Sequence, residues 1–346
     1  MAGWLKRLLV AVLVSSSLLA FDGNVLIEAK DAVKLIGKKG VVFVTGDNED
    51  IFDLGHIKGS VEMFAHHLHH ADINGNMPCA PLFMCPDEAE AFIGKHGIDN
   101  DTLVIAYDDF RGPNATGVYA FFKSFGHENI KILNGGRSAM MEIDPEQKKY
   151  DAMKEELKAL QESKAEKTVI DTFNEKLKSQ EKRLLVVKGH GESIEPKKYH
   201  IDLKKINYDY IAGKDELVKV AKDILEKGDK SSFAIIDARG FTEVIGERKL
   251  DNVARGGHVP GAKFIEWKHL TDFDKRLSFK DPTAMQELFD RHGVTKDKTI
   301  YAYCHVGAGR STHIVTALEM LGYPNVKVYT GSWDEWGNDM DLPIRR

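Results

Sequence analysis

The chain has 346 residues, of which 42% are hydrophobic and 29% are charged, and its formal net charge is −5. This composition is typical of a globular protein with enough apolar residues for two domains. The slight acidic excess argues against nucleic acid as a partner, and no segment beyond the N-terminus is apolar enough to predict a membrane span.

The first twenty residues have the features of a secretory signal peptide. Lys6 and Arg7 precede an apolar stretch, residues 8–20, that ends in small residues. A cationic start, a short apolar region and an alanine at the candidate cleavage site are typical of an export signal. The stretch is short for a transmembrane helix, although an uncleaved tether is the alternative. We expect residues 1–20 to be removed and the mature protein to be periplasmic or secreted, without stable membrane association.

Two halves of the chain repeat the same order of apolar segments and motifs, which indicates a duplicated domain. In each half, short apolar strands alternate with helical patterns. This alternation predicts an α/β fold with a parallel sheet flanked by helices, and sites in such sheets form at the carboxyl ends of strands. The repeated segments are 41–44 and 233–237, 55–60 and 257–262, 103–107 and 298–303, and 125–136 and 321–331, with helical patterns at 89–96 and 285–292.

Between the halves, residues 144–182 are rich in Glu and Lys and carry apolar residues at helical spacing. The pattern predicts two amphipathic helices, arranged as a hairpin, whose charges form solvated faces. A partner-binding arm is the alternative. One predicted stripe contains Tyr150, Met153, Leu157 and Leu160, and the other contains Val169, Ile170, Phe173 and Leu177.

The chain has three cysteines, and two of them lie close together in a proline-containing loop. Cys79 and Cys85 are six residues apart, so they could close a small disulfide in an oxidising compartment. Two free thiols are the alternative, because spacing alone does not fix geometry. Either arrangement leaves Cys304 unpaired.

Four histidines cluster just upstream of that loop, beside Asp72. A metal-binding or carrier site is one hypothesis for them. Adjacent histidines point to different sides of a regular element, so at most two could readily share one ion. A solvated loop is therefore our expectation, with no metal. The four are His66, His67, His69 and His70.

The segment that carries most chemistry lies near the C-terminus, where Cys304 follows the apolar run 299–303. A glycine-rich loop comes next, and a helical pattern opens at Ser311. Such a loop points backbone N–H groups inward and adds the positive end of the helix dipole, so it favours an anion. We expect Cys304 to attack as a thiolate. A buried structural cysteine is the alternative, but two glycines and an arginine argue against it. The loop residues are His305, Val306, Gly307, Ala308, Gly309 and Arg310.

Several motifs of the second half occur together in one known family. Asp237-Ala-Arg239, the Gly257-His-Val-Pro-Gly-Ala262 box, the cysteine loop and the closing segment 329–336 resemble the tandem-domain rhodaneses, the thiosulfate and mercaptopyruvate sulfurtransferases. The resemblance implies two rhodanese-like domains and a helical insert. Aligning the halves puts Asp108 where Cys304 stands, so only the second domain is expected to be catalytic. The expected parts are residues 25–142 (non-catalytic domain), 143–200 (insert and linker) and 213–346 (catalytic domain).

The resemblance also implies a reaction and its participants. Cys304 would take the outer sulfur of a small anionic donor as a persulfide and pass it to cyanide or a thiol, without a cofactor. The loop amides would bind the persulfide, and Arg310 would supply a fixed positive charge for a doubly charged donor. Arg239 and Arg255 are further candidates for substrate binding, with a structural salt bridge as the alternative for each. Glu243 and His258 are expected to be structural.

One feature departs from the family pattern. Sulfurtransferase loops usually have four residues between the cysteine and the arginine position, whereas this loop has five. Five is the spacing of tyrosine phosphatases and of cell-division-cycle phosphatases, so a phosphatase or arsenate reductase of rhodanese-like fold is an alternative function. A metal or sulfur carrier without turnover is another. We favour a thiosulfate sulfurtransferase, with thiosulfate or a polysulfide as donor rather than mercaptopyruvate, because the loop reads Cys-His-Val-Gly.

Overall fold

In the computed structural model, which describes residues 25–69 and 85–346, the first half of the chain forms a five-stranded parallel sheet. Its central strands are apolar and almost fully buried, as expected of a parallel sheet covered on both faces. The strands, in spatial order, are β1 (Leu26–Ile27), β6 (Ile130–Leu133), β5 (Leu103–Tyr107), β2 (Val41–Thr45) and β4 (Val61–Glu62).

The second half forms a second sheet with the same topology. Counted along its own half, each strand occupies the same place as in the first sheet, and all pairings are parallel. This repetition confirms the predicted fold of two duplicated α/β domains. The strands, in the corresponding order, are β8 (Ile211–Ala212), β12 (Val326–Tyr329), β11 (Thr299–Tyr303), β9 (Phe233–Asp237) and β10 (Lys263–Phe264).

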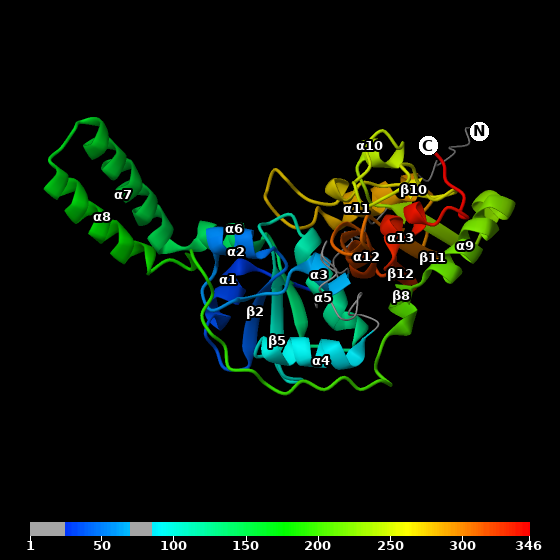
Figure 1. The fold of residues 1–346 in the computed structure, drawn as a ribbon, viewed down its shortest axis with the longest axis horizontal. Coiled ribbons are helices and arrows are strands. Elements are labelled where there is room, and N and C mark those ends of the chain that lie inside the picture. Colours follow the sequence, from blue (N-terminus) through cyan, green and yellow to red (C-terminus); the bar gives the residue numbers. More distant parts are fainter. Residues whose placement is uncertain (1–24, 70–84) are drawn as a thin grey trace, which may run out of the picture.

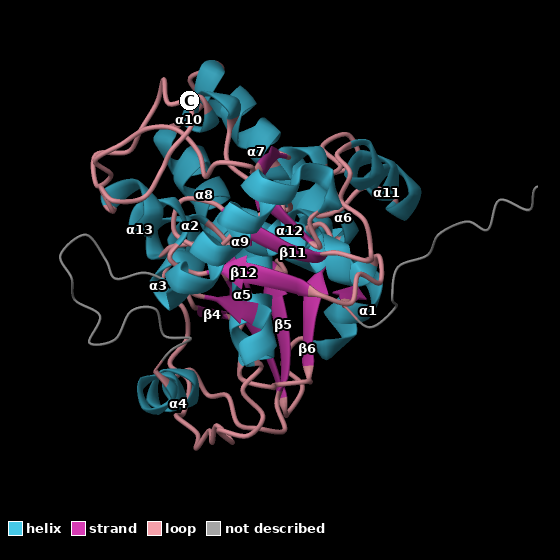
Figure 2. Cartoon of the chain, turned by 90° about the vertical axis from the view of Figure 1, so that its right-hand side faces the viewer, coloured by secondary structure: helices cyan, strands magenta, loops and turns pink. Residues whose placement is uncertain are grey.

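Helices cover the strands of both sheets (Figure 2). Side chains supply several of the caps: Asn48 accepts the N–H of Ile51 at the start of α2, and Asp281 accepts that of Thr283 at the start of α11. The first-domain helices are α1 (Ala29–Ala32), α2 (Glu49–Leu54), α3 (Ala65–His69), α4 (Pro86–Lys95), α5 (Pro113–Ser124) and α6 (Gly136–Ile143), and those of the second are α9 (Lys214–Lys227), α10 (Phe241–Val244), α11 (Pro282–Arg291), α12 (Arg310–Met320) and α13 (Ser332–Asn338).

In each half, the Gly-His segment (residues 55–60 or 257–262) is hydrogen-bonded to a tyrosine at the end of the central strand. Tyr107 accepts the backbone N–H of Ile57 on β3 (His56–Ile57), and Tyr303 accepts that of Val259, both at 3.1 Å. His258 lies 2.9 Å, through Nδ1, from the Val244 carbonyl. This hydrogen bond confirms the prediction that His258 is a structural residue.

The two domains meet through α5 and α12, which pack side by side and are buried along most of their length. Near the start of this helix pair, the hydroxyls of Thr116 and Thr312 lie 3.2 Å apart. Toward its end, Lys123 and Glu319 form an ion pair at 3.6 Å. The N-terminus of α12, and therefore the cysteine loop, is thus placed against the first domain.

The predicted helical hairpin is present and projects from the body of the molecule (Figure 1). It consists of α7 (Pro145–Glu162) and α8 (Lys167–Glu181), and Tyr150 donates to Glu181 across its base at 3.0 Å. The predicted stripes form the half-buried seam, except Val169, which is 45% exposed. Including Val169 in the stripe was wrong, because its side chain is exposed whereas that of its neighbour Ile170 is half-buried.

A linker then leads back to the body. Its first strand, β7 (Val186–Val187), pairs with β3 of the first domain before the chain reaches β8. The predicted signal peptide, residues 1–20, lies outside the described residues. In the part that the structure describes, no helix is long and apolar enough to span a membrane.

Candidate active site

Cys304 follows β11 directly and is held by its backbone. Its N–H donates to the Ser332 hydroxyl at 3.1 Å, and its carbonyl accepts the N–H of Trp333 at 3.1 Å. The residue is 1% exposed and is a free thiol. The first two residues of α13 therefore fix the backbone of Cys304, where β11 ends and the loop begins.

The sulfur atom lies inside the loop that follows it. Sγ donates to the Ala308 carbonyl at 3.2 Å, and the Ser311 hydroxyl donates to Sγ at 3.4 Å. The first contact belongs to the protonated thiol, because a thiolate has no proton to donate. The second can be made to a thiol, a thiolate or a persulfide.

The backbone N–H groups around this sulfur form an open cradle. Within the described residues, those of 305–311 make no hydrogen bond, and α12 begins at Arg310. Gly307 and Gly309 have φ angles of +78° and +74°, a region that other residues rarely adopt. At Gly307 a Cβ atom would also lie 2.1 Å from the Thr330 carbonyl oxygen. The sequence therefore needs glycine there for conformation and for space.

Arg310 forms a two-pronged ion pair with Glu243. Nη1 lies 2.6 Å from Oε2, and Nη2 lies 3.3 Å from Oε1. Burial acts to lower the pKa of Arg310, but the charges of a Cys304 thiolate and of Glu243 raise it, and the net shift is upward. The guanidinium therefore stays protonated beside the loop, with one carboxylate already bound.

His305 is neutral in this site. Its Nε2 atom lies 3.1 Å from Asn252 Oδ1, so the ring nitrogen is the donor. Burial lowers the pKa of His305 to about 4, although Asp334 acts in the opposite direction. The side chain thus fixes the loop to the neighbouring segment and adds no positive charge to the cradle.

A cavity of about 340 Å³ lies beside the loop, between the two domains. Arg310 reaches it from the loop, while Cys304 does not line it. Its wall is rich in charged groups from both domains. The lining residues are His66, Asp108, Asp109, Arg111, Pro113, Asn114, Glu243, Arg248, Leu250, Trp267 and Arg310.

The equivalent loop of the first domain is filled by its own side chain. Asp108, in the position of Cys304, accepts backbone N–H groups from Gly112 and Asn114 at 3.1 Å and from Ala115 at 3.3 Å. Burial, with the nearby Asp47 and Asp109 carboxylates, raises the pKa of Asp108 to about 8. This loop has four residues before its helix, one fewer than the cysteine loop. The Asp108 carboxyl therefore occupies N–H groups of the first-domain loop, whereas those of the cysteine loop are available within the described residues.

The family model of the rhodanese-like domain matches residues 28–142 and again residues 217–339, which together are more than half of the chain. The chain belongs to the rhodanese-like family. It carries two rhodanese domains in tandem, and its relatives place it among the sulfurtransferases of that family.

Two relatives cover most of the chain. The sulfur carrier protein TtuD of Thermus thermophilus is 28% identical over 314 residues, which are 86% of this chain and 89% of TtuD. A proposed thiosulfate sulfurtransferase of Mycobacterium leprae, SseA, is 27% identical over 317 residues, which are 89% of this chain and 86% of that protein.

Two solved structures share the fold. SseA of Escherichia coli, described with the rhodanese fold of 3-mercaptopyruvate sulfotransferases, superposes with a TM-score of 0.62 at 20% identity, over 89% of this chain and 98% of that one. The anaerobic ergothioneine biosynthesis enzyme of Chlorobium limicola gives 0.64 at 19% identity, over 93% and 70%. At such identities the likeness shows the rhodanese fold alone.

The prediction that Arg239 binds substrate needs correction. Arg239 is 1% exposed, lies 2.6 Å from Asp237 through Nη2, donates to the Gly257 carbonyl, and stacks 4.4 Å over the Trp333 ring. A guanidinium engaged in this way inside the second rhodanese domain has no free face for a ligand. Arg239 is a structural residue.

Arg255 is corrected for the same reason. Its guanidinium donates to the backbone carbonyls of Gly337 at 3.2 Å, Leu342 at 2.8 Å and Trp336 at 3.1 Å, and also to that of Asp339. Cations that bind the last carbonyls of a helix stabilise its C-terminus. Arg255 thus fastens the end of α13 and does not face the cavity.

Two residues of the site were missed by the sequence reasoning. Ser311 directly follows Arg310, and its place in the first turn of the helix could have suggested a hydroxyl near the sulfur. Arg248 lines the cavity although it belongs to no motif, so only the folded structure identifies it.

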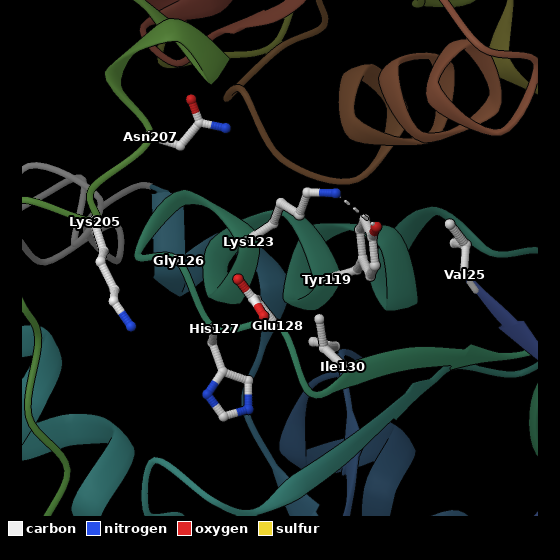
Figure 3. Close-up of a pocket in the computed structure, with 9 residues that line it drawn as sticks. All are labelled: Val25, Tyr119, Lys123, Gly126, His127, Glu128, Ile130, Lys205 and Asn207. Atoms are coloured by element: carbon white, nitrogen blue, oxygen red, sulfur yellow. Dashed lines mark hydrogen bonds between the residues drawn. The ribbon is translucent and has the colours of Figure 1, made fainter. Parts of the chain in front are cut away.

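Another cavity is remote from this chemistry. It measures about 640 Å³ and lies near the opposite end of α5 from the cysteine loop (Figure 3). Lys123 donates there to Tyr119 at 3.3 Å, and the described residues of this wall include no cysteine. Its size alone does not make it an active site.

The histidine cluster and the cysteine pair are described only in part. In residues 25–69 and 85–346, no group of three potential ligands could hold a metal ion. His70, Asp72 and Cys79 lie outside these ranges, so a metal site there stays an untested hypothesis. Cys85 is disulfide-bonded, and its predicted partner Cys79 lies outside the described residues.

Proposed function

We propose that this rhodanese moves a sulfane sulfur from thiosulfate or a polysulfide to cyanide or a thiol, through a persulfide on Cys304. The observation that supports it best is the contrast between the two loops. Within residues 25–69 and 85–346, the N–H groups of the loop that follows the free thiol have no partner, whereas Asp108 accepts the N–H groups of the equivalent loop in the first domain. In the described part of the chain, the second-domain loop thus combines a nucleophile with available N–H donors, and the first-domain loop does not.

The proposed reaction has two displacements. In the first, the Cys304 thiolate attacks the outer sulfur of thiosulfate, the S–S bond breaks, and sulfite leaves with the electron pair. In the second, cyanide attacks the outer sulfur of the persulfide, and thiocyanate leaves as the Cys304 thiolate is restored. Each anionic stage would gain from loop N–H groups that turn toward the sulfur, and such preorganised donors typically contribute about 3 kcal/mol each.

One side-chain hydroxyl and one backbone carbonyl contact Sγ, and they respond differently when the thiol loses its proton. The Ser311 hydroxyl already donates to Sγ, so it supports the thiolate and the persulfide. The Ala308 carbonyl accepts from the thiol and would repel a thiolate. We therefore expect this peptide to turn when the sulfur loses its proton, which adds one more N–H group to the cradle.

A phosphatase or arsenate reductase is the second candidate, and the five-residue loop is the observation in its favour. Against it, Arg310 is bound to Glu243 at 2.6 Å, whereas a tetrahedral oxyanion needs this guanidinium opposite the sulfur. Deleting Ala308 separates the two. It restores the four-residue spacing, so sulfur transfer should persist, while oxyanion binding and aryl phosphate hydrolysis should be lost.

The deciding assay compares three reactions of the purified protein: thiosulfate with cyanide, 3-mercaptopyruvate with a thiol, and an aryl phosphate with water. We expect thiocyanate formation to dominate and to disappear in Cys304→Ser. The Cys79→Ser/Cys85→Ser double variant should keep most of it. Faster aryl phosphate hydrolysis than thiocyanate formation would support the phosphatase instead. Sulfur bound once without turnover would support a carrier, the role in the name of the Thermus relative.

Export is a separate proposal that rests on the first twenty residues. We expect the mature protein to begin near residue 21 and to be periplasmic or secreted. Sequencing of its N-terminus after expression in a Gram-negative host tests this directly. A mature chain that still begins at Met1 would contradict it.

A further inference from the structure

One buried serine next to the cysteine loop has a strained backbone. Within residues 25–69 and 85–346, three residues other than glycine have positive φ angles. Lys164 and Arg276 lie in exposed turns, whereas Ser332 is fully buried. The φ angle of Ser332 is +51°, in a region that residues with a Cβ atom rarely adopt. Such strain persists only where the surrounding contacts fix it, and it often marks a functional position.

The first domain has a glycine at the equivalent place in its repeat. Gly136 has a φ angle of +54°, which glycine adopts without strain. A Cβ atom there would lie 2.3 Å from the Asp108 carbonyl oxygen, so this turn has no room for a side chain. The second domain therefore carries Ser332 at a place where the duplicated domain carries the less strained residue.

The Ser332 side chain joins its turn to the backbone of the nucleophile. Its hydroxyl accepts the Cys304 N–H at 3.1 Å and donates to the Tyr329 carbonyl at 2.9 Å. All three residues are buried, so loss of the hydroxyl would deprive a buried N–H of this acceptor. The hydroxyl is thus the group that distinguishes the strained turn of the second domain from the relaxed turn of the first.

The start of α13 also orients the peptides of the cysteine loop. The N–H groups of Trp333 and Asp334 donate to the carbonyls of Cys304 and His305, at 3.1 and 2.9 Å. The C=O and N–H of a planar trans peptide point in opposite directions. The N–H groups of His305 and Val306 therefore point away from α13, and both belong to the unpaired donors of the loop within the described residues.

We propose that Ser332 is a positioning residue for sulfur transfer. Its strained turn and its hydroxyl hold the Cys304 backbone in the orientation from which the loop N–H groups bind a negatively charged sulfur. This inference rests on the proposed function and adds a residue that acts through the backbone of the nucleophile. The first domain has Asp108 in place of the cysteine, and it also lacks this hydroxyl, as the proposed role requires.

The first test is single-turnover loading of Cys304 from thiosulfate, followed by the release of sulfite. Ser332→Gly removes the hydroxyl and relieves the strain, and the first domain shows that glycine suits this turn, so the variant should fold. Its loading rate should fall about tenfold, the effect of one lost hydrogen bond at a charged site. Ser332→Ala should slow loading as much, but it should unfold at a lower temperature than Ser332→Gly because it keeps the strain.

Ser124→Ala is the matched control. It also removes a buried hydroxyl that donates to a backbone carbonyl, that of Phe121 at 2.7 Å, but at the end of α5. We expect this variant to load sulfur at the wild-type rate.

The second test does not need sulfur transfer. Iodoacetamide is uncharged and reacts with the thiolate, so the pH profile of Cys304 alkylation, followed by peptide mapping, reports how well the site supports a negative sulfur. In Ser332→Gly this profile should move toward higher pH by about one unit, with an unchanged limiting rate at high pH.

Two outcomes would overturn the role of Ser332. One is a wild-type loading rate together with a wild-type pH profile in Ser332→Gly. The other is faster alkylation at every pH, because that would show only that the buried thiol had become exposed. If the wild-type protein takes up no sulfur from thiosulfate, the proposed function fails, and the pH profile still tests Ser332.

Discussion

The Arg310 guanidinium and the Glu243 carboxylate form an ion pair whose partners are 25% and 9% exposed. Arg310 is the first residue of the helix after the cysteine loop. Glu243 is the third residue of α10, where its carboxylate also accepts the Gly240 N–H at 3.4 Å. The pair joins the two segments that enclose the cavity. Removing one member of such a pair leaves a poorly solvated charge, so the pair fixes Arg310 in place.

Glu243→Gln should therefore lower the free energy of unfolding by about 2 kcal/mol at pH 7. Burial alone would raise the pKa of Glu243, but Arg310 outweighs it and the pKa is lowered from 4.5. A lowered pKa means that the stabilisation is full above 4.5 and is lost as the pH falls through the folded-state pKa. Urea unfolding at pH 7 and in acid should show the difference shrinking. Glu247→Gln, an exposed neighbour, is the control, and an equal loss there would contradict the assignment.

The two glycines of the loop should respond differently to alanine. Both have positive φ angles, and Gly309 has a ψ angle of −92°, so each substitution adds roughly 1–3 kcal/mol of backbone strain. At Gly307 the new Cβ would also lie 2.1 Å from a backbone oxygen, whereas at Gly309 nothing lies within 3.5 Å of it. Gly307→Ala should abolish activity or folding, and Gly309→Ala should keep measurable activity. Thiocyanate formation and thermal unfolding measure both, and equal loss in the two variants would contradict this loop geometry.

Ser311→Ala should slow sulfur loading of Cys304 about tenfold, because a hydrogen bond to a charged acceptor is worth roughly 1.5 kcal/mol or more. The hydroxyl lies 3.4 Å from Sγ. Single-turnover loading from thiosulfate, followed by the appearance of sulfite, isolates this step. Ser163→Ala, on the exposed hairpin, provides the control. An unchanged loading rate in Ser311→Ala would show that the hydroxyl does not support the thiolate.

The free energy of unfolding of Asp108→Asn should increase relative to that of the wild type as the pH rises. The pKa of Asp108 is raised to about 8, mainly by burial, so its favourable contribution is present at low pH and is lost as the pH rises through 8. Asparagine keeps an acceptor for the three N–H groups and carries no charge. From pH 5 to pH 8 we expect a shift of about 3.5 kcal/mol in favour of the variant. Chemical denaturation at both values measures it, and a shift of opposite sign would contradict a buried, protonated Asp108.

Much of the fold follows from local patterns in the sequence. The apolar runs at 103–107 and 233–237 became strands with those bounds, because short apolar segments between turn signals have few alternatives in a parallel sheet. The hairpin followed from its 3.6-residue periodicity. Val169 was misplaced because periodicity alone does not show how wide the buried stripe of a helix is.

The partners of charged side chains could not be predicted in this way. Arg239, Arg248, Arg255 and Arg310 lie near one another in the second half, and sequence spacing gave no reason to separate them. In the folded protein, Arg239 is buried against Asp237, and Arg255 binds the end of α13. Arg310 pairs with Glu243. These contacts join residues 2 to 81 positions apart, so only the tertiary structure separates these three arginines from Arg248, whose guanidinium has no partner among the described residues.

The central claim is that Cys304 carries the transferred sulfur, and intact mass spectrometry tests it most directly. After treatment with thiosulfate and removal of excess donor, the protein should have gained one sulfur atom, located by peptide mapping on the segment that contains Cys304. Addition of cyanide should remove that sulfur and release one equivalent of thiocyanate. Cys304→Ser should gain nothing. An unmodified Cys304, or a gain of sulfur that persists in Cys304→Ser, would contradict the account.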